Sequence, residues 1–176
     1  RLLFARGELP PPFNESVQPQ LPSEQWDTTR LALANRNYSA AYIRNGISAL
    51  VETIGREAAL EIGKIAARLI GLQYFPVMTE LLDMPDGDFE DTANFFSAMF
   101  VAMGDQTDIQ IDRANRQATV HHTDLHITKF LNQNQQADLL SCWTELYVGM
   151  ANSHRLFKHV EVEHSDGRLT WKISDR

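Results

Sequence analysis

Apolar residues recur at helical spacing along the first half of the chain. One stripe ends near Gly55 and a second ends near Gly71, and both keep the steps of three and four residues that align side chains on one helix face. The first stripe contains Ile43, Ile47, Leu50, Val51 and Ile54, and the second contains Ala58, Ile62, Ile65, Ala66 and Leu69. The pattern predicts two amphipathic helices joined by a tight turn.

Further helices are expected on both sides of a central pair of strands. Pro76 can open a short helix to Leu82, and the Met84–Gly87 segment breaks it. Asp88 can cap a helix that stops at Gly104 and carries the stripe Phe89, Ala93, Phe96, Phe100 and Met103. After an Asn/Gln-rich connection, residues 132–136, a last helix carries Leu139, Trp143, Leu146, Tyr147 and Met150 on one face.

Two segments alternate apolar and polar residues as antiparallel hairpins do. In the first, a turn over 113–116, in which Asn115 is able to take a left-handed conformation, pairs Ile109 with Val120 and Ile111 with Ala118. This register places Thr107 opposite His122, so that His122 points inward and His121 outward. In the second, the Asp166–Gly167 turn pairs Val162 with Trp171 and Val160 with Ile173, which sets Glu161 beside Lys172 and Glu163 beside Thr170 on the wet face.

The order of these elements predicts an α+β fold. We expect an antiparallel sheet of about four strands, made of two hairpins and packed against a layer of helices. Residues 1–24 hold five of the seven prolines among polar residues and are expected to form an extended arm. No later stretch reads as a linker, so residues 25–176 are expected to form a single domain.

Charge and composition limit the classes of molecule that this chain is expected to bind. A net charge of -7 disfavours nucleic acid and anionic membranes, and no apolar run is long enough for a membrane span. The single Cys142 excludes an internal disulfide, so a reducing, cytoplasmic location is expected. Small molecules and proteins remain as partners, and an uncovered apolar helix face could also make a homo-oligomer.

Three of the six histidines fall in the segment from His121 to His126, where a strand gives way to another element. His122 and His126 are four residues apart, a spacing that places both on one face, and Asp124 joins them if the strand continues. Three interpretations stay open. His122 could be a hydrogen-bonded residue at a sheet edge. The group could perform acid–base catalysis, with Asp124 fixing a tautomer. It could also form an open metal site, although no metal is taken as the expectation.

Cys142 and five aromatic residues are the remaining candidates. Cys142 could act as a nucleophile near His126, or it could be a small core residue of an amphipathic helix. An apolar substrate ring could be held by Phe96, Phe100, Trp143, Tyr147 and Trp171. The same residues could equally be the anchors of a core.

Several short motifs are similar to those of a known family. The motifs are Gly55–Ala59, the acidic helix start Asp88–Asp91, the hairpin from Ile109 to His122, the Cys142 helix and the Asp166–Gly167 turn. In this order they resemble the L-2-amino-thiazoline-4-carboxylic acid hydrolase-like family, itself similar to vinyl reductase type small-molecule-binding domains. Other cysteines of that family are replaced here, for example by the segment from His122 to Leu125.

The resemblance implies hydrolytic opening of a C–N bond in a small cyclic substrate. His122, Asp124, His126 and Cys142 would be its catalytic residues, with no cofactor. The alternative is a non-catalytic ligand-binding or protein-interaction module like the vinyl reductase domains, in which the same pocket binds without turnover. A reaction rate that changes with pH in the range where histidine titrates would favour the enzyme.

Overall fold

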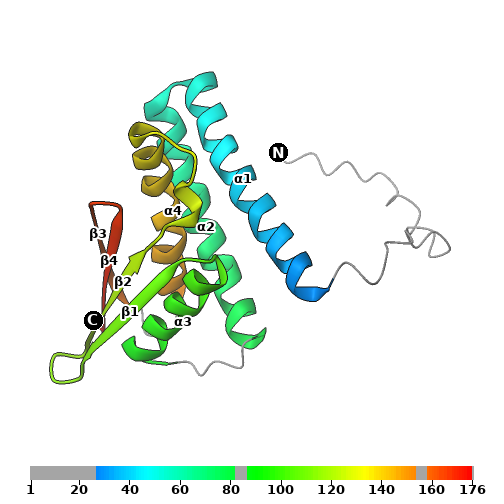
Figure 1. Cartoon of the computed structure of the whole chain (residues 1–176). Coiled ribbons are helices and arrows are strands. Elements are labelled where there is room, and N and C mark those ends of the chain that lie inside the picture. The colour runs from blue at the N-terminus through cyan, green and yellow to red at the C-terminus, as the bar shows by residue number, and fades with distance from the viewer. Residues whose placement is uncertain (1–26, 82–86, 154–157, 176) are drawn as a thin grey trace, which may run out of the picture. The chain divides into compact units, whose positions relative to one another are not determined.

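The predicted α+β fold is confirmed in the computed structural model, which describes residues 27–81, 87–153 and 158–175 (Figure 1). The α-helices are α1 (Thr28–Ile54), α2 (Arg56–Leu81), α3 (Phe89–Ala102) and α4 (Gln133–Ser153). The strands are β1 (Gln106–Asp112), β2 (Gln117–Thr123), β3 (His159–Ser165) and β4 (Arg168–Ser174), and the short 3-10 helix η1 (His126–Thr128) follows β2.

The chain divides into two units, Arg1–Asn37 and Tyr38–Arg176, so the boundary falls within α1. In the first unit the structure describes the beginning of α1, and the second unit contains all of the other elements. The proline-rich arm expected over 1–24 lies outside the described residues. The single domain expected over 25–176 stays a prediction.

The sheet is antiparallel with the strand order β1-β2-β4-β3. The register predicted for the first hairpin is confirmed, with Thr107 opposite His122 and Ile109 opposite Val120. The register of the second is confirmed too, with Val162 opposite Trp171. Buried and less buried residues alternate along β2 and β4, as expected for a sheet whose one face is covered by helices.

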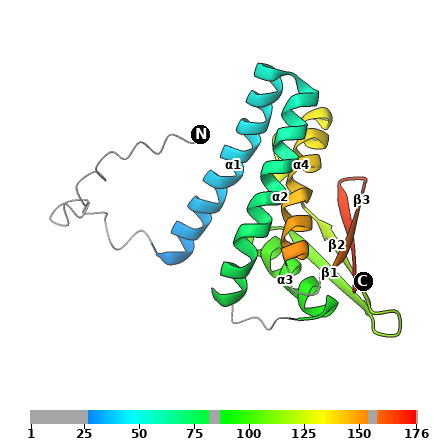
Figure 2. The same ribbon diagram turned by 180° about the vertical axis from the view of Figure 1, so that it is seen from behind.

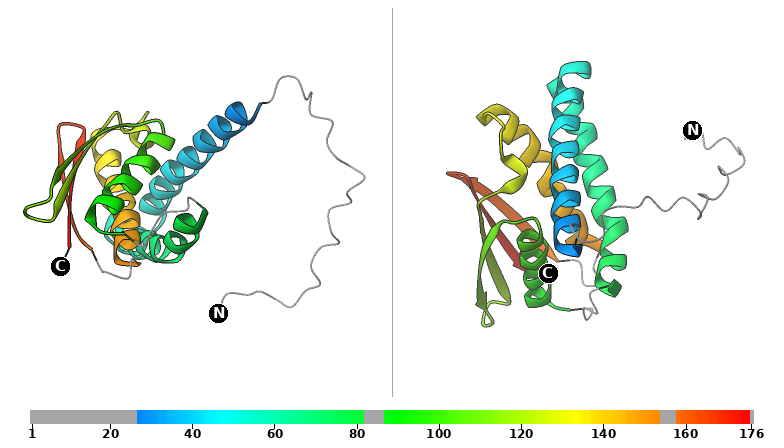
Figure 3. Two further views of the ribbon diagram at one scale, coloured as in Figure 1. Left: turned by 90° about the horizontal axis from the view of Figure 1, so that it is seen from below. Right: turned by 45° about the vertical axis from the view of Figure 1, so that its right-hand side comes forward.

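α3 and α4 pack against the covered face of the sheet, and α2 packs on α4 (Figure 3). Between them lies a core of interlocking rings, in which the Phe96 ring meets Tyr147 and Trp171 edge to face at 5.2 and 5.5 Å between centroids. Each ring contributes apolar burial and a further ring–ring attraction of about 0.5–1.5 kcal/mol. This core fixes α3, α4 and the sheet as one body.

α2 differs from the prediction, because it continues through Gly71 and Pro76 to Leu81 instead of ending at Gly71. A Cβ atom on Gly71 would lie 2.0 Å from the carbonyl oxygen of Leu146 in α4. Gly71 therefore permits a close approach of two helix backbones and does not cap a helix. Gly149 of α4 has the same role, since its Cβ would lie 2.3 Å from the carbonyl oxygen of Arg68.

Two local predictions are corrected by side-chain hydrogen bonds. The connection predicted over 132–136 is mostly helix, because Asn132 and Gln135 each accept a hydrogen bond from the other's backbone N–H at 3.0 and 3.1 Å and so cap the start of α4. In the first hairpin turn the left-handed residue is Arg116, with φ of 51°, and not Asn115. Asn115 is held by the Asp112 carboxylate at 2.7 Å. The cap predicted at Asp88 is confirmed, since its side chain accepts from the backbone of Glu90 and Asp91.

Candidate functional site

His122 is fully buried and paired with a carboxylate that the sequence analysis did not identify. Its Nε2 lies 2.7 Å from Oδ2 of Asp105, and neither side chain is exposed to solvent. The imidazole is stacked on the ring of Phe100, with 3.9 Å between centroids and 9° between planes. The other carboxylate oxygen of Asp105 accepts a hydrogen bond from the backbone N–H of His126 at 2.6 Å. Asp105 thus joins the start of β1 to the end of β2 and to η1.

Asp124 does not join the inward face, because β2 ends at Thr123. Asp124 is exposed and has a left-handed φ of 55°, which turns the chain toward η1. His126 meets the His122–Asp105 pair through its backbone N–H. The structure therefore brings His122 and the His126 backbone together at Asp105 and leaves the Asp124 side chain apart from them.

The confirmed register contained a signal for Asp105. Thr107 lies opposite His122 on the covered face, and a residue two positions earlier shares that face. A buried imidazole needs a hydrogen-bond partner, so the nearest acidic residue at such a diagonal position is a strong candidate. Asp124 is closer to His122 in sequence, but the carboxylate that pairs with the imidazole is that of Asp105.

Cys142 lies on the side of α4 that faces α2. A Cβ atom on Gly63 would stand 2.7 Å from its sulfur, and the sulfur is 3.9 Å from the carbonyl oxygen of Leu60. Burial raises the pKa of the Cys142 thiol, an effect that the hydrogen bond with Ser141 and the charge of Lys64 reduce without cancelling. A thiol with a raised pKa is a poor nucleophile at neutral pH.

The aromatic candidates belong to the core. Phe96, Phe100 and Trp171 have no exposed surface, and Tyr147 keeps only 3 %. Burial, together with the nearby charge of Asp105, raises the pKa of the Tyr147 phenol, so this group stays protonated. Of the five aromatic candidates, Trp143 lines the hollow described next.

An apolar hollow of about 360 Å³ lies between α1, α2 and α4, and we refer to it as the apolar groove. Its walls are almost entirely hydrocarbon. They are formed by Tyr42, Ile43, Gly46, Ile47 and Leu50 of α1, by Ile62, Gly63, Ala66, Ala67 and Ile70 of α2, and by Leu139, Cys142, Trp143 and Leu146 of α4. Leu50, Ile62 and Ile70 remain 37, 52 and 46 % exposed, so the groove is open to solvent.

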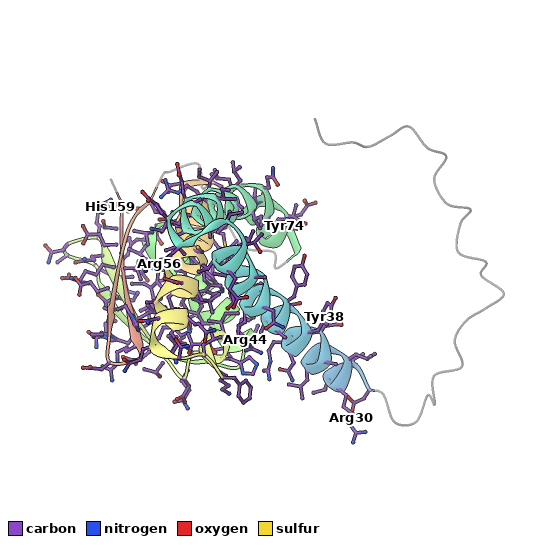
Figure 4. The ribbon with its side chains drawn as sticks, turned by 90° about the horizontal axis from the view of Figure 1, so that it is seen from above. Arg30, Tyr38, Arg44, Arg56, Tyr74 and His159 are labelled. Atoms are coloured by element: carbon purple, nitrogen blue, oxygen red, sulfur yellow. The ribbon has the colours of Figure 1, made fainter. Side chains whose placement is uncertain are left out.

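α1 forms one wall of the groove and buries little of its surface. Ala40 is its one fully buried residue among those that the structure describes. Arg44 extends from α1 to the segment after β2, where its Nη1 donates to the carbonyl oxygen of His126 at 3.2 Å (Figure 4). The same guanidinium lies 5.8 Å from the centroid of the Phe130 ring. These contacts connect the groove wall to the segment that Asp105 fixes.

Within residues 27–81, 87–153 and 158–175, no group of three histidine, cysteine or acidic side chains has the arrangement of a metal site. In the same ranges no helix is long and apolar enough to cross a membrane.

Comparison with known proteins gives a likeness in fold. No family model matches the sequence, and no curated protein sequence matches it. Among solved structures, the chain is similar to a trafficking protein particle complex subunit 3 from Naegleria fowleri, covalently bound to palmitic acid. The TM-score is 0.63 at 10 % identity, and the match covers 81 % of this chain and 96 % of that chain. An identity this low shows a shared fold and nothing finer.

The expectation of a hydrolase that opens a C–N bond is wrong. The solved structure that shares this fold is a trafficking protein particle complex subunit 3 and not a hydrolase. The geometry agrees, because a general acid or base must reach its substrate and His122 is sealed beneath Phe100. The resemblance to the L-2-amino-thiazoline-4-carboxylic acid hydrolase-like family stays a prediction.

Proposed function

We propose that this protein is a non-catalytic binding module that holds a long apolar chain, such as that of a fatty acid, in the apolar groove. The observation that carries the proposal is the groove itself, a hollow of about 360 Å³ whose walls come from three helices and are almost entirely apolar. Hollows of roughly 300–1,000 Å³ with apolar walls are typical of small-molecule sites. The palmitic acid carried by the similar trafficking subunit supports the same class of ligand.

Binding is expected to be non-covalent in this chain. The lone thiol in the groove, Cys142, has a raised pKa and lies against α2, so an attack on an acyl donor is disfavoured. The free thiol also supports the cytoplasmic location expected from the sequence. Affinity must then come from burial of methylene groups, each of which contributes about 0.8 kcal/mol.

The test is calorimetric titration with saturated fatty acids of increasing length, below their micelle concentrations. We expect the dissociation constant to fall about fourfold for each added methylene until the groove is full. The ligand should be recovered unchanged, and mass spectrometry should find no acyl group on Cys142. Turnover of the ligand, or an affinity that does not depend on chain length, would contradict the proposal.

Gly46 and Asn45 provide a matched pair of variants on α1. A Cβ atom on Gly46 meets nothing within 4 Å, so Gly46→Leu should fold while its side chain fills the groove. Asn45 is exposed and does not line the groove, so Asn45→Leu adds the same side chain elsewhere. We expect Gly46→Leu to abolish binding and Asn45→Leu to leave it unchanged. Equal affinities of the two variants would place the ligand at another site.

A further inference from the structure

α2 carries a second apolar surface, on the side away from α4, which shares Ile62 with the apolar groove. Ala58, Ile62, Ile65, Leu69 and Leu72 follow one another at steps of four, three, four and three, the spacing of a helix–helix seam. Ile62, Ile65, Leu69 and Leu72 are 52, 55, 51 and 37 % exposed. Gly63 and Gly71 face α4 on the opposite side of the helix. We call these five residues the outer stripe.

The outer stripe has room for further side chains. α2 lies in front of α4 in Figure 2, and the described elements leave the stripe open to solvent. Beside it is a hollow of about 350 Å³, lined by Ile65, Leu69 and Leu72 together with Glu61, Lys64, Arg68 and Glu145. An exposed row of aliphatic residues rimmed by charges is typical of a protein–protein contact.

We propose that the outer stripe is covered by α2 of a second copy of this chain, packed antiparallel about a two-fold axis between Ile62 and Ile65. In that arrangement Ile62 lies opposite Ile65 of the partner subunit, and Leu69 lies opposite Ala58 of the partner subunit. Glu61 and Arg68 are seven residues apart, two helical turns, and so share one flank of the stripe. Two-fold symmetry brings the same flanks together, so that Glu61 meets Arg68 of the partner subunit twice.

Charge complementarity selects this arrangement over its neighbours. A parallel pairing would set the charged flank against the opposite flank of the partner, where Ala66 and Gln73 offer no charge. An antiparallel shift by one heptad would bring like charges together, either at Arg68 or at Glu61. Of these arrangements, the proposed antiparallel register is the one that sets unlike charges opposite each other. Charges at such flanking positions determine the orientation in which a partner helix binds.

Arg68 can pair with a carboxylate of its own chain and with a carboxylate of a second copy at the same time. Its Nε lies 2.7 Å and its Nη2 2.5 Å from Oε2 of Glu145. A guanidinium has five N–H donors, and the Arg68 side chain is still 52 % exposed, so donors remain for a carboxylate of a second copy. The dimer needs no disulfide, because the single Cys142 is buried between α2 and α4.

The first test is sedimentation velocity of the full chain over a range of concentrations, with reductant present. We expect a reversible monomer–dimer equilibrium. Ile65→Glu should weaken it by a factor on the order of a hundred, because symmetry removes two buried isoleucines. Val101→Glu is the control. Val101 is a β-branched residue of α3 that is 56 % exposed and lies outside the stripe. A wild-type chain that stays monomeric at millimolar concentration, or a dimer that Ile65→Glu leaves unchanged, would overturn the proposal.

A charge swap tests the register without touching the stripe. Glu61→Arg and Arg68→Glu should each dissociate the dimer, because each sets like charges against one another twice. Mixed in equal amounts, the two variants should form a heterodimer in which both pairs are complementary again, and native mass spectrometry distinguishes it by mass. Circular dichroism checks that both variants are folded. Failure of the mixture to associate would overturn the antiparallel register.

Discussion

His122 illustrates what a buried polar side chain needs in order to be stable. Its Nε2 is satisfied by Asp105, while Nδ1 has no hydrogen-bond partner among the described residues. An unsatisfied buried nitrogen costs about 1–3 kcal/mol, so the unpaired Nδ1 lowers the free energy of unfolding by about that amount. The stacking on Phe100 and the bond to Asp105 offset this cost by holding three elements together.

Asp105→Ala should lower the free energy of unfolding by about 3–5 kcal/mol, because it leaves both His122 and the His126 N–H without an acceptor. Urea unfolding followed by circular dichroism measures the change. Asp124→Asn is the matched control, since Asn tolerates the left-handed backbone there and the residue is exposed. We expect this control to stay within about 0.5 kcal/mol of the wild type. A larger loss at Asp124 than at Asp105 would refute the assignment.

The raised pKa of Cys142 predicts its reactivity. The alkylation rate with iodoacetamide should rise with pH only above the ordinary thiol value of 9.0 in the native protein, and should follow that value after unfolding. The protonated thiol contributes stability that is complete below the unfolded pKa and is lost as pH rises through the folded pKa. Cys142→Ala should lack this alkaline loss. Rapid alkylation of the native protein at neutral pH would contradict the buried, protonated thiol.

At the level of elements, the contact between α2 and α4 depends on glycine. Gly71→Ala would force a Cβ into backbone atoms of Leu146 and Met150, at 2.0 and 2.8 Å, which cannot move aside as a side-chain end can. We expect a loss of roughly 1–3 kcal/mol in the free energy of unfolding, the cost of overpacking.

Gly46→Ala is the control for Gly71→Ala, because it makes the same chemical change in another helix. Its Cβ meets open space, so the substitution should stabilise the protein by about 0.5–1 kcal/mol through helix propensity. Thermal unfolding of both variants would check the two signs. A neutral Gly71→Ala would mean that the two helices separate easily.

These elements also show how far the sequence allows prediction. The registers of both hairpins followed from alternation, because a slip by one residue exposes the whole buried set. The sequence predicts a helix end at Gly71 because a cap and a close helix contact both require glycine, and only the position of α4 distinguishes them. Asp105 differs from Gly71, because the predicted pairing of Thr107 with His122 already places Asp105 on the same face two positions earlier, although 17 residues separate it from His122 in sequence.

At the level of the whole molecule, stability is unevenly distributed. α2 and α4 are joined by close backbone contacts, whereas α1 buries only Ala40 among its described residues. A helix with so little buried surface opens locally at low cost. We therefore expect the groove wall that α1 supplies to be its most mobile wall on the timescale of hydrogen exchange.

Hydrogen exchange with mass spectrometry should detect this difference. We expect amides of residues 38–54 to exchange faster than those of α4, and a bound fatty acid to slow exchange in 38–54 more than in β4. Gly46→Leu should show no such slowing, because its groove is already filled. Exchange in α1 as slow as in α4 without ligand would contradict the expectation.

The strand order has one more consequence. β1 and β3 are the borders of the sheet, and they carry Asp108 and Asp112 on one side and Glu161 and Glu163 on the other. A strand from a neighbouring chain that approached either border would meet acidic side chains, and charged residues on edge strands are one way in which proteins prevent sheets from growing into aggregates. We therefore expect these charges to disfavour assembly of this protein through its sheet borders.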